Sequence, residues 1–115
     1  MAKVAWYYHR KNCQTCLKAD TYLESRKITA ETQLDARKDR FDFKAAKALL
    51  KDVKKLYATK GTKVIECDLK ADKLDDEELQ ALLIGPSGNL RAPSIKNGDV
   101  MLVGFNSDMY DRGLN

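Results

Sequence analysis

The sequence is poor in the residues on which disulfide-rich and metal-rich proteins depend. It contains three cysteines, one histidine and two prolines in 115 residues. Three cysteines do not form a structural disulfide framework, and in a reducing compartment they more often indicate a metal site or catalysis. No apolar run approaches the ~18 residues that a membrane-spanning helix needs, so no membrane association is expected.

A signal peptide and a strong net charge are also missing. Residues 1–4 lead straight into strand-like sequence, without an apolar region and cleavage site, so we expect a cytoplasmic protein. The formal net charge of +4 favours anionic partners but is too small to indicate nucleic-acid binding. The length, with 43% hydrophobic and 33% charged residues, predicts one soluble globular domain over residues 1–115.

The N-terminal half begins with a strand and a helix. Residues 3–9 (KVAWYYH) are nearly all apolar or aromatic, as in a strand covered on both faces. We interpret its aromatic residues as core and active-site wall, because no basic residues alternate with them as in a base-stacking surface. Helical spacing starts near Cys16 and predicts a helix to residue 26 or 27. Residues 28–35 partly alternate and predict a second, weaker strand.

The middle of the chain predicts mostly helix. Asp42 resembles a helix cap, and apolar residues follow at steps of three and four from Phe43 to Tyr57, which predicts one amphipathic helix ended by Gly61. Five lysines flank its apolar stripe and form either a solvated face or a basic docking face: Lys44, Lys47, Lys51, Lys54 and Lys55. Residues 63–69 are strand-like, and Asp75 resembles the first residue of a capping box before a short helix.

The C-terminal part predicts a hairpin and a last helix. Asn97-Gly98 is a strong turn between strand patterns at residues 92–96 and 100–105. Asn106 is expected to cap a helix that Gly113 stops. The whole order predicts an α/β fold, a mixed four- to five-stranded sheet flanked by helices, with further helices before the C-terminal β-hairpin.

The most informative motif is Cys13-Gln14-Thr15-Cys16, at the turn from the first strand to the first helix. A helix start has unpaired N–H groups and partial positive charge, so a thiol placed there ionises more easily. We predict Cys13 as the nucleophile, with Arg10 and Lys11 adding positive charge nearby. Cys16, within the first helical turn, is predicted to be less exposed and to act as the resolving thiol.

Zinc is the main rival interpretation of the same residues. His9, Cys13, Cys16 and Cys67 are of suitable type for a four-ligand site. Only one close cysteine pair exists, however, where structural zinc sites usually have two, so we expect no metal. Cys67 is interpreted as a core residue, with a third redox thiol as the alternative.

The chain resembles the thioredoxin-fold family that unites glutaredoxin-type arsenate reductases (ArsC) with Spx-type transcriptional regulators. Three segments carry the resemblance: Cys13-Gln14-Thr15-Cys16, Arg91-Ala92-Pro93 and Val103-Gly104-Phe105-Asn106. It implies a thioredoxin-like fold and a cis peptide at Pro93 facing the active site. The residues between 42 and 84 correspond to the insertion that separates this family from shorter glutaredoxins.

The resemblance also has departures. These reductases usually have a single cysteine at the turn, so Cys16 makes this chain a C-x-x-C variant. They place an arginine directly before the proline, where this chain has Ala92, with Arg91 one position earlier. Arg91 is expected to hold an anion or the thiolate. His9 keeps the family's spacing to the cysteine and either tunes the thiol or makes a local hydrogen bond.

Further anion-binding arginines of the family have no clear counterpart, and Arg37 and Arg40 are the candidates. The function predicted is a thiol–disulfide oxidoreductase that cycles Cys13 and Cys16, without a bound organic cofactor. Glutathione, thioredoxin or a similar thiol would donate electrons, and the substrate would be a protein disulfide or a small oxyanion such as arsenate. The alternative is a redox-sensing regulator of the Spx type, in which the disulfide switches binding to RNA polymerase or another protein.

Overall fold

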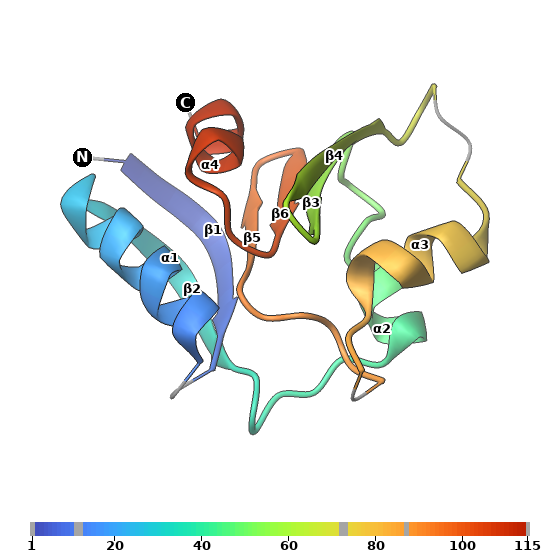
Figure 1. Cartoon of the computed structure of the whole chain (residues 1–115), viewed down its shortest axis with the longest axis horizontal. Coiled ribbons are helices and arrows are strands. Elements are labelled where there is room, and N and C mark those ends of the chain that lie inside the picture. Colours follow the sequence, from blue (N-terminus) through green and yellow to red (C-terminus); the bar gives the residue numbers. More distant parts are fainter. Residues whose placement is uncertain (1, 11–12, 72–73, 87, 115) are drawn as a thin grey trace.

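The structure is a computed structural model that describes residues 2–10, 13–71, 74–86 and 88–114. Lys11, one of the predicted site residues, lies outside these ranges. Within them, ten elements follow one another in the chain (Figure 1). They are β1 Ala2–His9, α1 Gln14–Ser25, β2 Ile28–Asp35, α2 Phe43–Ala48, β3 Lys55–Lys60, β4 Lys63–Asp68, α3 Asp76–Leu83, β5 Ser94–Asn97, β6 Val100–Val103 and α4 Ser107–Leu114. None of the described helices is both long and apolar enough to cross a bilayer.

The described strands form one mixed sheet in the order β2-β1-β5-β6-β3-β4. β1 and β2 are parallel and joined through α1, which is a βαβ unit. β5 pairs antiparallel with both β1 and β6, and β6 pairs parallel with β3. β3 and β4 form a second antiparallel hairpin at the far edge. The sheet therefore has six strands, where four to five were predicted, and the α/β, thioredoxin-like class is confirmed.

Helices cover both faces of the sheet and give two apolar cores. Tyr7 packs in a core with residues of α1 and α4, whereas the next residue, Tyr8, packs in a core with residues of α2 and α3. Successive side chains of a strand point to opposite faces, which explains this division. Tyr8 is fully buried and Tyr7 is 3% exposed. The aromatic part of β1 is thus core, as predicted.

The predicted helix from Phe43 to Tyr57 was wrong in length. α2 ends at Ala48, and residues 55–60 form strand β3 between β6 and β4. Four consecutive side chains of β3, residues 56–59, are buried because neighbours cover both its faces and edges. Gly61, with φ +63°, lies in the turn from β3 to β4 and does not end a helix. The insertion before the C-terminal hairpin therefore contains a hairpin as well as helices.

The five lysines consequently do not share one helix face. Lys44 and Lys47 lie on α2, whereas Lys54 precedes β3 and Lys55 begins it. Lys55 lies 3.6 Å from Glu66 of the neighbouring strand, and Lys47 pairs with Asp76 at the start of α3. The single helix on which the five lysines were predicted to form a solvated face or a basic docking face is absent from the described part of the chain.

The local start signals of the helices are confirmed. Asp42 Oδ1 accepts a hydrogen bond from the N–H of residue 45 at 2.9 Å, and Asp75 Oδ1 accepts one from the N–H of residue 78 at 2.8 Å. Asn106 caps α4 in the same way at 3.0 Å. Gly113, however, lies inside α4 and does not stop it. A Cβ at Gly113 would come within 2.5 Å of Leu102 Cδ2, so glycine allows α4 to pack closely on β6.

Candidate functional site

Cys13 is the N-cap residue of α1. Its backbone is extended, with φ −106° and ψ 120°, and its Sγ accepts a hydrogen bond from the Cys16 N–H at 3.4 Å. Its carbonyl accepts the first helical hydrogen bond, from the Leu17 N–H at 2.8 Å. Sulfur thus occupies the position where a cap usually places oxygen. The side chain is partly exposed and carries a free thiol, so it is accessible to a reactant.

Cys16 lies beneath Cys13 and is 1% exposed. Its Sγ accepts a hydrogen bond from the Arg10 N–H at 3.4 Å, which ties the residue after β1 to the first turn of α1. Burial raises the pKa of the Cys16 thiol to about 12, and its contact with the Cys13 thiol acts in the same direction. Cys16 is therefore a protonated thiol at neutral pH. Cys16 is the less exposed of the two cysteines, as the sequence predicted.

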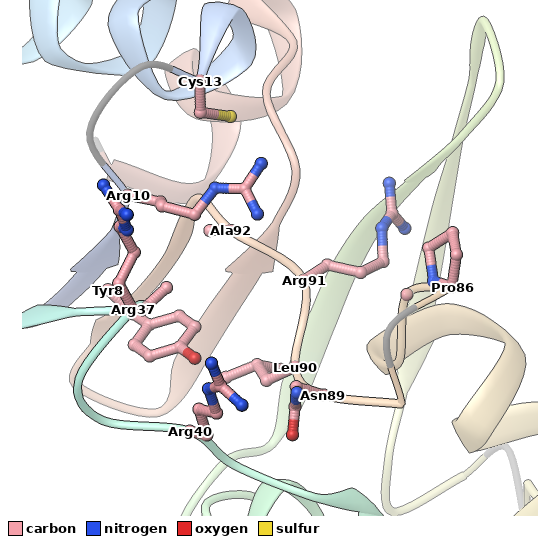
Figure 2. A pocket seen from close by; sticks show the side chains of 12 residues that line it. Tyr8, Arg10, Cys13, Arg37, Arg40, Pro86, Asn89, Leu90, Arg91 and Ala92 are labelled. Atoms are coloured by element: carbon pink, nitrogen blue, oxygen red, sulfur yellow. The ribbon is translucent and has the colours of Figure 1, made fainter.

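An open cleft of about 810 Å³ begins at Cys13. Three segments line it: the end of β1 together with the N-cap of α1, the loop after β2 and the loop before β5. Figure 2 shows the labelled side chains around it, with Arg10 reaching in below Cys13. Among the residues that the structure describes, the lining includes four arginines and no carboxylate: Tyr8, Arg10, Cys13, Ala36, Arg37, Arg40, Gly85, Pro86, Asn89, Leu90, Arg91 and Ala92. Such a lining favours an anion.

Arg91 uses its guanidinium to hold the fold rather than to reach into the cleft. Nη1 donates to the Thr59 carbonyl at 2.7 Å and to the Leu82 carbonyl at 3.2 Å. Nη2 donates to Thr59 Oγ1 at 2.9 Å. In Figure 2 the side chain extends away from Arg10. Burial lowers the pKa of Arg91, although its guanidinium stays charged. The geometry therefore favours an anchoring role over the predicted anion-binding one.

The loop that Arg91 anchors contains the predicted proline. The Ala92–Pro93 peptide is cis, as expected. Ala92 lines the cleft together with Cys13, and the Pro93 carbonyl accepts a hydrogen bond from the Gly104 N–H at 2.8 Å. This bond joins the loop to the segment after β6. The structure thus brings Cys13, Arg10 and Ala92 to one cleft, with Pro93 buried directly behind Ala92.

His9 lies on the other face of the sheet from that cleft. Its ring stacks on Tyr7 at 4.9 Å, and its Nε2 is 2.8 Å from Gln33 Nε2. His9 Nδ1 lies 3.8 Å from Asp20 Oδ1, which also accepts a hydrogen bond from the Tyr7 hydroxyl at 2.6 Å. The local hydrogen bond predicted as one alternative for His9 is present.

The four residues proposed as zinc ligands are not brought together. Cys67 is buried on β4, which is separated from β1 by three strands. Over residues 2–10, 13–71, 74–86 and 88–114, no group of three or more histidine, cysteine, aspartate or glutamate side chains is arranged to hold a metal. Cys67 packs with Leu56 and Leu79, as its interpretation as a core residue requires.

Asp20 is the residue near the thiols that the sequence did not bring out, whereas Tyr7 was predicted as core and active-site wall. Asp20 follows Cys16 by four residues on α1, so the two side chains share one helix face. That spacing was readable once the helix was placed. The pairing of Asp20 with Tyr7 was not, because it depends on how α1 packs across β1.

Comparisons with known proteins agree with this architecture. The ArsC family matches residues 8–112 of the chain. A solved structure described as "YFFB (PA3664) PROTEIN" aligns with a TM-score of 0.56 and 24% sequence identity, covering 96% of this chain and 98% of that one. No curated protein matches. The likeness to the solved structure supports the thioredoxin-type fold, and the family match spans both cysteines and the cis-proline loop. The chain belongs to the ArsC family, as a thioredoxin-fold protein of the ArsC/Spx type.

Proposed function

We propose that the protein is a thiol–disulfide oxidoreductase in which Cys13 attacks the substrate and Cys16 resolves the product. Membership of the ArsC family supports a thiol-dependent reductase type of function. The separate roles of the two cysteines rest on one observation, the difference in their positions. Cys13 caps α1 at an open cleft, and Cys16 is buried beneath it.

The first step is attack by the Cys13 thiolate on one sulfur of a substrate disulfide. The Cys16 N–H, which already donates to Cys13 Sγ, favours the negative charge there, as does the positive end of α1. A new bond forms between Cys13 Sγ and the attacked sulfur. The substrate disulfide bond breaks, and the other sulfur leaves as a thiolate.

The second step is attack by Cys16 on Cys13 Sγ. Cys16 loses its proton, its sulfur forms the Cys13–Cys16 disulfide, and the bound substrate sulfur leaves as a second thiolate. The substrate has then gained two electrons and the protein has lost two. Glutathione, thioredoxin or a similar thiol donor would return the pair to the dithiol by the reverse exchange.

The cleft favours an anionic substrate or donor. Arg10, Arg37 and Arg40 line it, and a guanidinium suits carboxylates and oxyanions. A volume of about 810 Å³ matches the size of sites for organic ligands, and a small oxyanion fills only a fraction of it. We therefore favour a disulfide bearing carboxylates, such as one that contains glutathione, over arsenate.

The test is turnover of a glutathione mixed disulfide with glutathione as the electron donor, followed through NADPH consumption by glutathione reductase. We expect Cys13→Ser to reduce the rate to background. Cys67→Ala serves as the matched cysteine control and should retain most of the rate. Peptide mapping after mild oxidation should show a Cys13–Cys16 disulfide. Full activity of Cys13→Ser, or the absence of that disulfide, would overturn the proposal.

A redox-sensing regulator is the alternative that the sequence left open. Its predicted docking surface, a long lysine-rich helix, is not what the described residues form. The two functions differ in one measurable way. A regulator should bind a protein from lysate only when Cys13 and Cys16 are oxidised and show little turnover, whereas the reductase should turn over and retain no such partner.

A further inference from the structure

A polar cluster lies beside Cys16 on the face of the sheet away from the arginine-lined cleft. Its centre is Asp20 of α1, whose Oδ1 accepts a hydrogen bond from the Tyr7 hydroxyl at 2.6 Å. His9 Nδ1 lies 3.8 Å from the same oxygen, and the His9 ring stacks on Tyr7 at 4.9 Å. Gln33 of β2 contacts His9 Nε2 at 2.8 Å and fixes the other side of the ring.

The helix places this cluster next to the buried thiol. Cys16 and Asp20 are four residues apart on α1, and side chains at that spacing lie one above the other. A helical side chain also leans toward the N-terminus, which directs the Asp20 side chain toward the turn of α1 that carries Cys16. The negative charge of Asp20 is one of the causes that raise the pKa of Cys16, which agrees with their proximity.

The cluster is also open to solvent. Asp20, Tyr7 and His9 line a second open cavity of about 370 Å³ that does not include the residues of the arginine-lined cleft. The Asp20 side chain is 34% exposed, whereas Cys16 is 1% exposed. A proton that leaves Cys16 through Asp20 can therefore reach water without crossing the space that the substrate occupies.

We propose that Asp20 accepts the proton of Cys16 when Cys16 attacks the mixed disulfide, and that Tyr7 and His9 are positioning residues for that carboxylate. This inference rests on the proposed function. The Cys16 S–H proton passes to an Asp20 oxygen as the Cys16–Cys13 bond forms. The Cys13–substrate bond breaks, its electron pair leaves on the substrate sulfur, and Asp20 later releases the proton to water in the second cavity.

The titratable groups around Asp20 come from three elements. Tyr7 and His9 face it from β1, Cys16 and Glu24 flank it on α1, and Tyr110 of α4 lies within electrostatic reach of both Cys16 and Asp20. Burial raises the pKa of Tyr7 and of Tyr110 far above neutral pH, so both phenols stay protonated. Asp20 is thus the carboxylate closest along α1 to the thiol.

The test separates the two chemical steps. Reduced protein is mixed rapidly with the chromogenic aromatic disulfide dithiobis(nitrobenzoate), and release of thionitrobenzoate is followed by absorbance. Attack by Cys13 releases one equivalent, and resolution by Cys16 releases the second. Cys16→Ser identifies the phases by losing the second one. We expect Asp20→Asn to leave the first phase within about twofold of the native rate and to slow the second at least about tenfold at neutral pH.

The controls use the same helix and cavity. Glu24→Gln removes a carboxylate one turn further along α1 and should leave both phases unchanged. Tyr7→Phe and His9→Gln should slow only the second phase, and less than Asp20→Asn does. A thermal unfolding curve and the unchanged first phase show that each variant is folded.

The result that would overturn the proposed role of Asp20 is also defined. If Asp20 acted only through its charge, Asp20→Asn would lower the pKa of Cys16 and make the second phase faster. An unchanged or faster second phase therefore overturns the inference while the proposed function stands. Absence of a second phase in the native protein overturns the resolving role of Cys16, and with it this inference.

Discussion

Replacing Gly104 with alanine tests how the cis-proline loop is held beside Cys13. Gly104 has φ +89°, a conformation that side chains with a Cβ rarely adopt. A Cβ built there would lie 2.1 Å from Thr59 Oγ1 and 3.3 Å from Arg91 Nη2. Thr59 is 9% exposed, so its side chain has little room to move.

The expected loss of stability has two parts. A left-handed backbone costs a residue with a Cβ roughly 1–2 kcal/mol. Displacing Thr59 Oγ1 breaks the hydrogen bond from Arg91 Nη2, and a bond to a charged group contributes about 1.5–3 kcal/mol. We therefore expect Gly104→Ala to lower the free energy of unfolding by roughly 2.5–5 kcal/mol, a large part of the ~5–15 kcal/mol typical of a domain.

Urea unfolding measures this change in the free energy of unfolding, and Gly61→Ala is the matched control. Gly61 has φ +63°, but no atom within 4 Å would meet a Cβ there, so only the backbone part of the cost applies. Gly61→Ala should lose roughly 1–2 kcal/mol. Adding Thr59→Ala to Gly104→Ala removes the atom that the new methyl meets, so the double variant should lose less than the sum of the two single variants.

Equal losses for Gly104→Ala and Gly61→Ala would refute the steric part of this reasoning. Strict additivity with Thr59→Ala would refute the contact between the two positions. The reductase assay adds a functional readout, since a displaced Arg91 loosens the loop that carries Ala92 into the cleft. We expect kcat/KM of Gly104→Ala to fall even at temperatures where the variant is fully folded.

Three further predictions concern the cleft, the thiols and one tyrosine. Replacing Arg37 and Arg40 together with glutamine should raise KM for an anionic disulfide by roughly tenfold with little change in kcat, because two exposed ion pairs together contribute about 1–2 kcal/mol to binding. In the native reduced protein, iodoacetamide at neutral pH should modify Cys13 and leave the buried Cys16 intact, as mass spectrometry of peptides will show. Tyr22 should ionise near pH 12, because burial and its hydrogen bond to Asp111 raise its pKa to about 12 from 10.0. Its contribution to stability is fully present below pH 10 and is lost as pH rises toward 12, and Tyr22→Phe should remove that transition from an ultraviolet titration.

For each of these three predictions, a specific result would contradict it. Arg26→Gln, an exposed arginine at the far end of α1, is the control for the cleft pair and should leave KM unchanged. A fall in kcat with unchanged KM would contradict an anion-binding role. Modification of Cys16 at the same rate as Cys13 would contradict its burial, and a Tyr22 transition at pH 10 would contradict its pairing with Asp111.

The sequence was most informative where structure is decided within a few residues. Asp42, Asp75 and Asn106 were predicted as caps, and each accepts the hydrogen bond from the N–H three residues later. The Asn97-Gly98 turn joins β5 and β6, with Asn97 paired to Val100. These features depend on local backbone chemistry, so no knowledge of distant contacts was needed to place them.

The β3 strand shows why the middle of the chain was misread. Leu50, Val53 and Tyr57 repeat at helical steps, but they belong to a turn, a loop and a strand. Tyr57 pairs with Leu102, which is far away in the sequence, on one side and with Glu66 of the adjoining hairpin strand on the other. Pairing on both edges makes the strand more stable than the helix that its periodicity suggests, and only the tertiary structure reveals it.

The candidate site also has a part that depends on local sequence and a part that depends on distant contacts. Cys13 and Cys16 were predictable because one strand-to-helix turn holds both. The cleft was only partly predictable, since its arginines come from three separate segments. The anchoring of Arg91 could not be foreseen, because its acceptors, Thr59 and Leu82, lie on elements whose positions depend on β3.

Strand β1 contributes side chains to the surroundings of both cysteines in the proposed reaction. Tyr8 and Arg10 of the β1 segment line the cleft in front of Cys13, whereas Tyr7 and His9 line the cavity behind Cys16. Because the side chains alternate, charge changes in the cleft and proton acceptance behind the helix involve different residues. Substitutions in the cleft should therefore change which disulfide reacts with Cys13, and substitutions behind α1 should change how fast Cys16 completes the reaction. A variant on one side that alters both steps equally would mean that the two faces are not chemically separate.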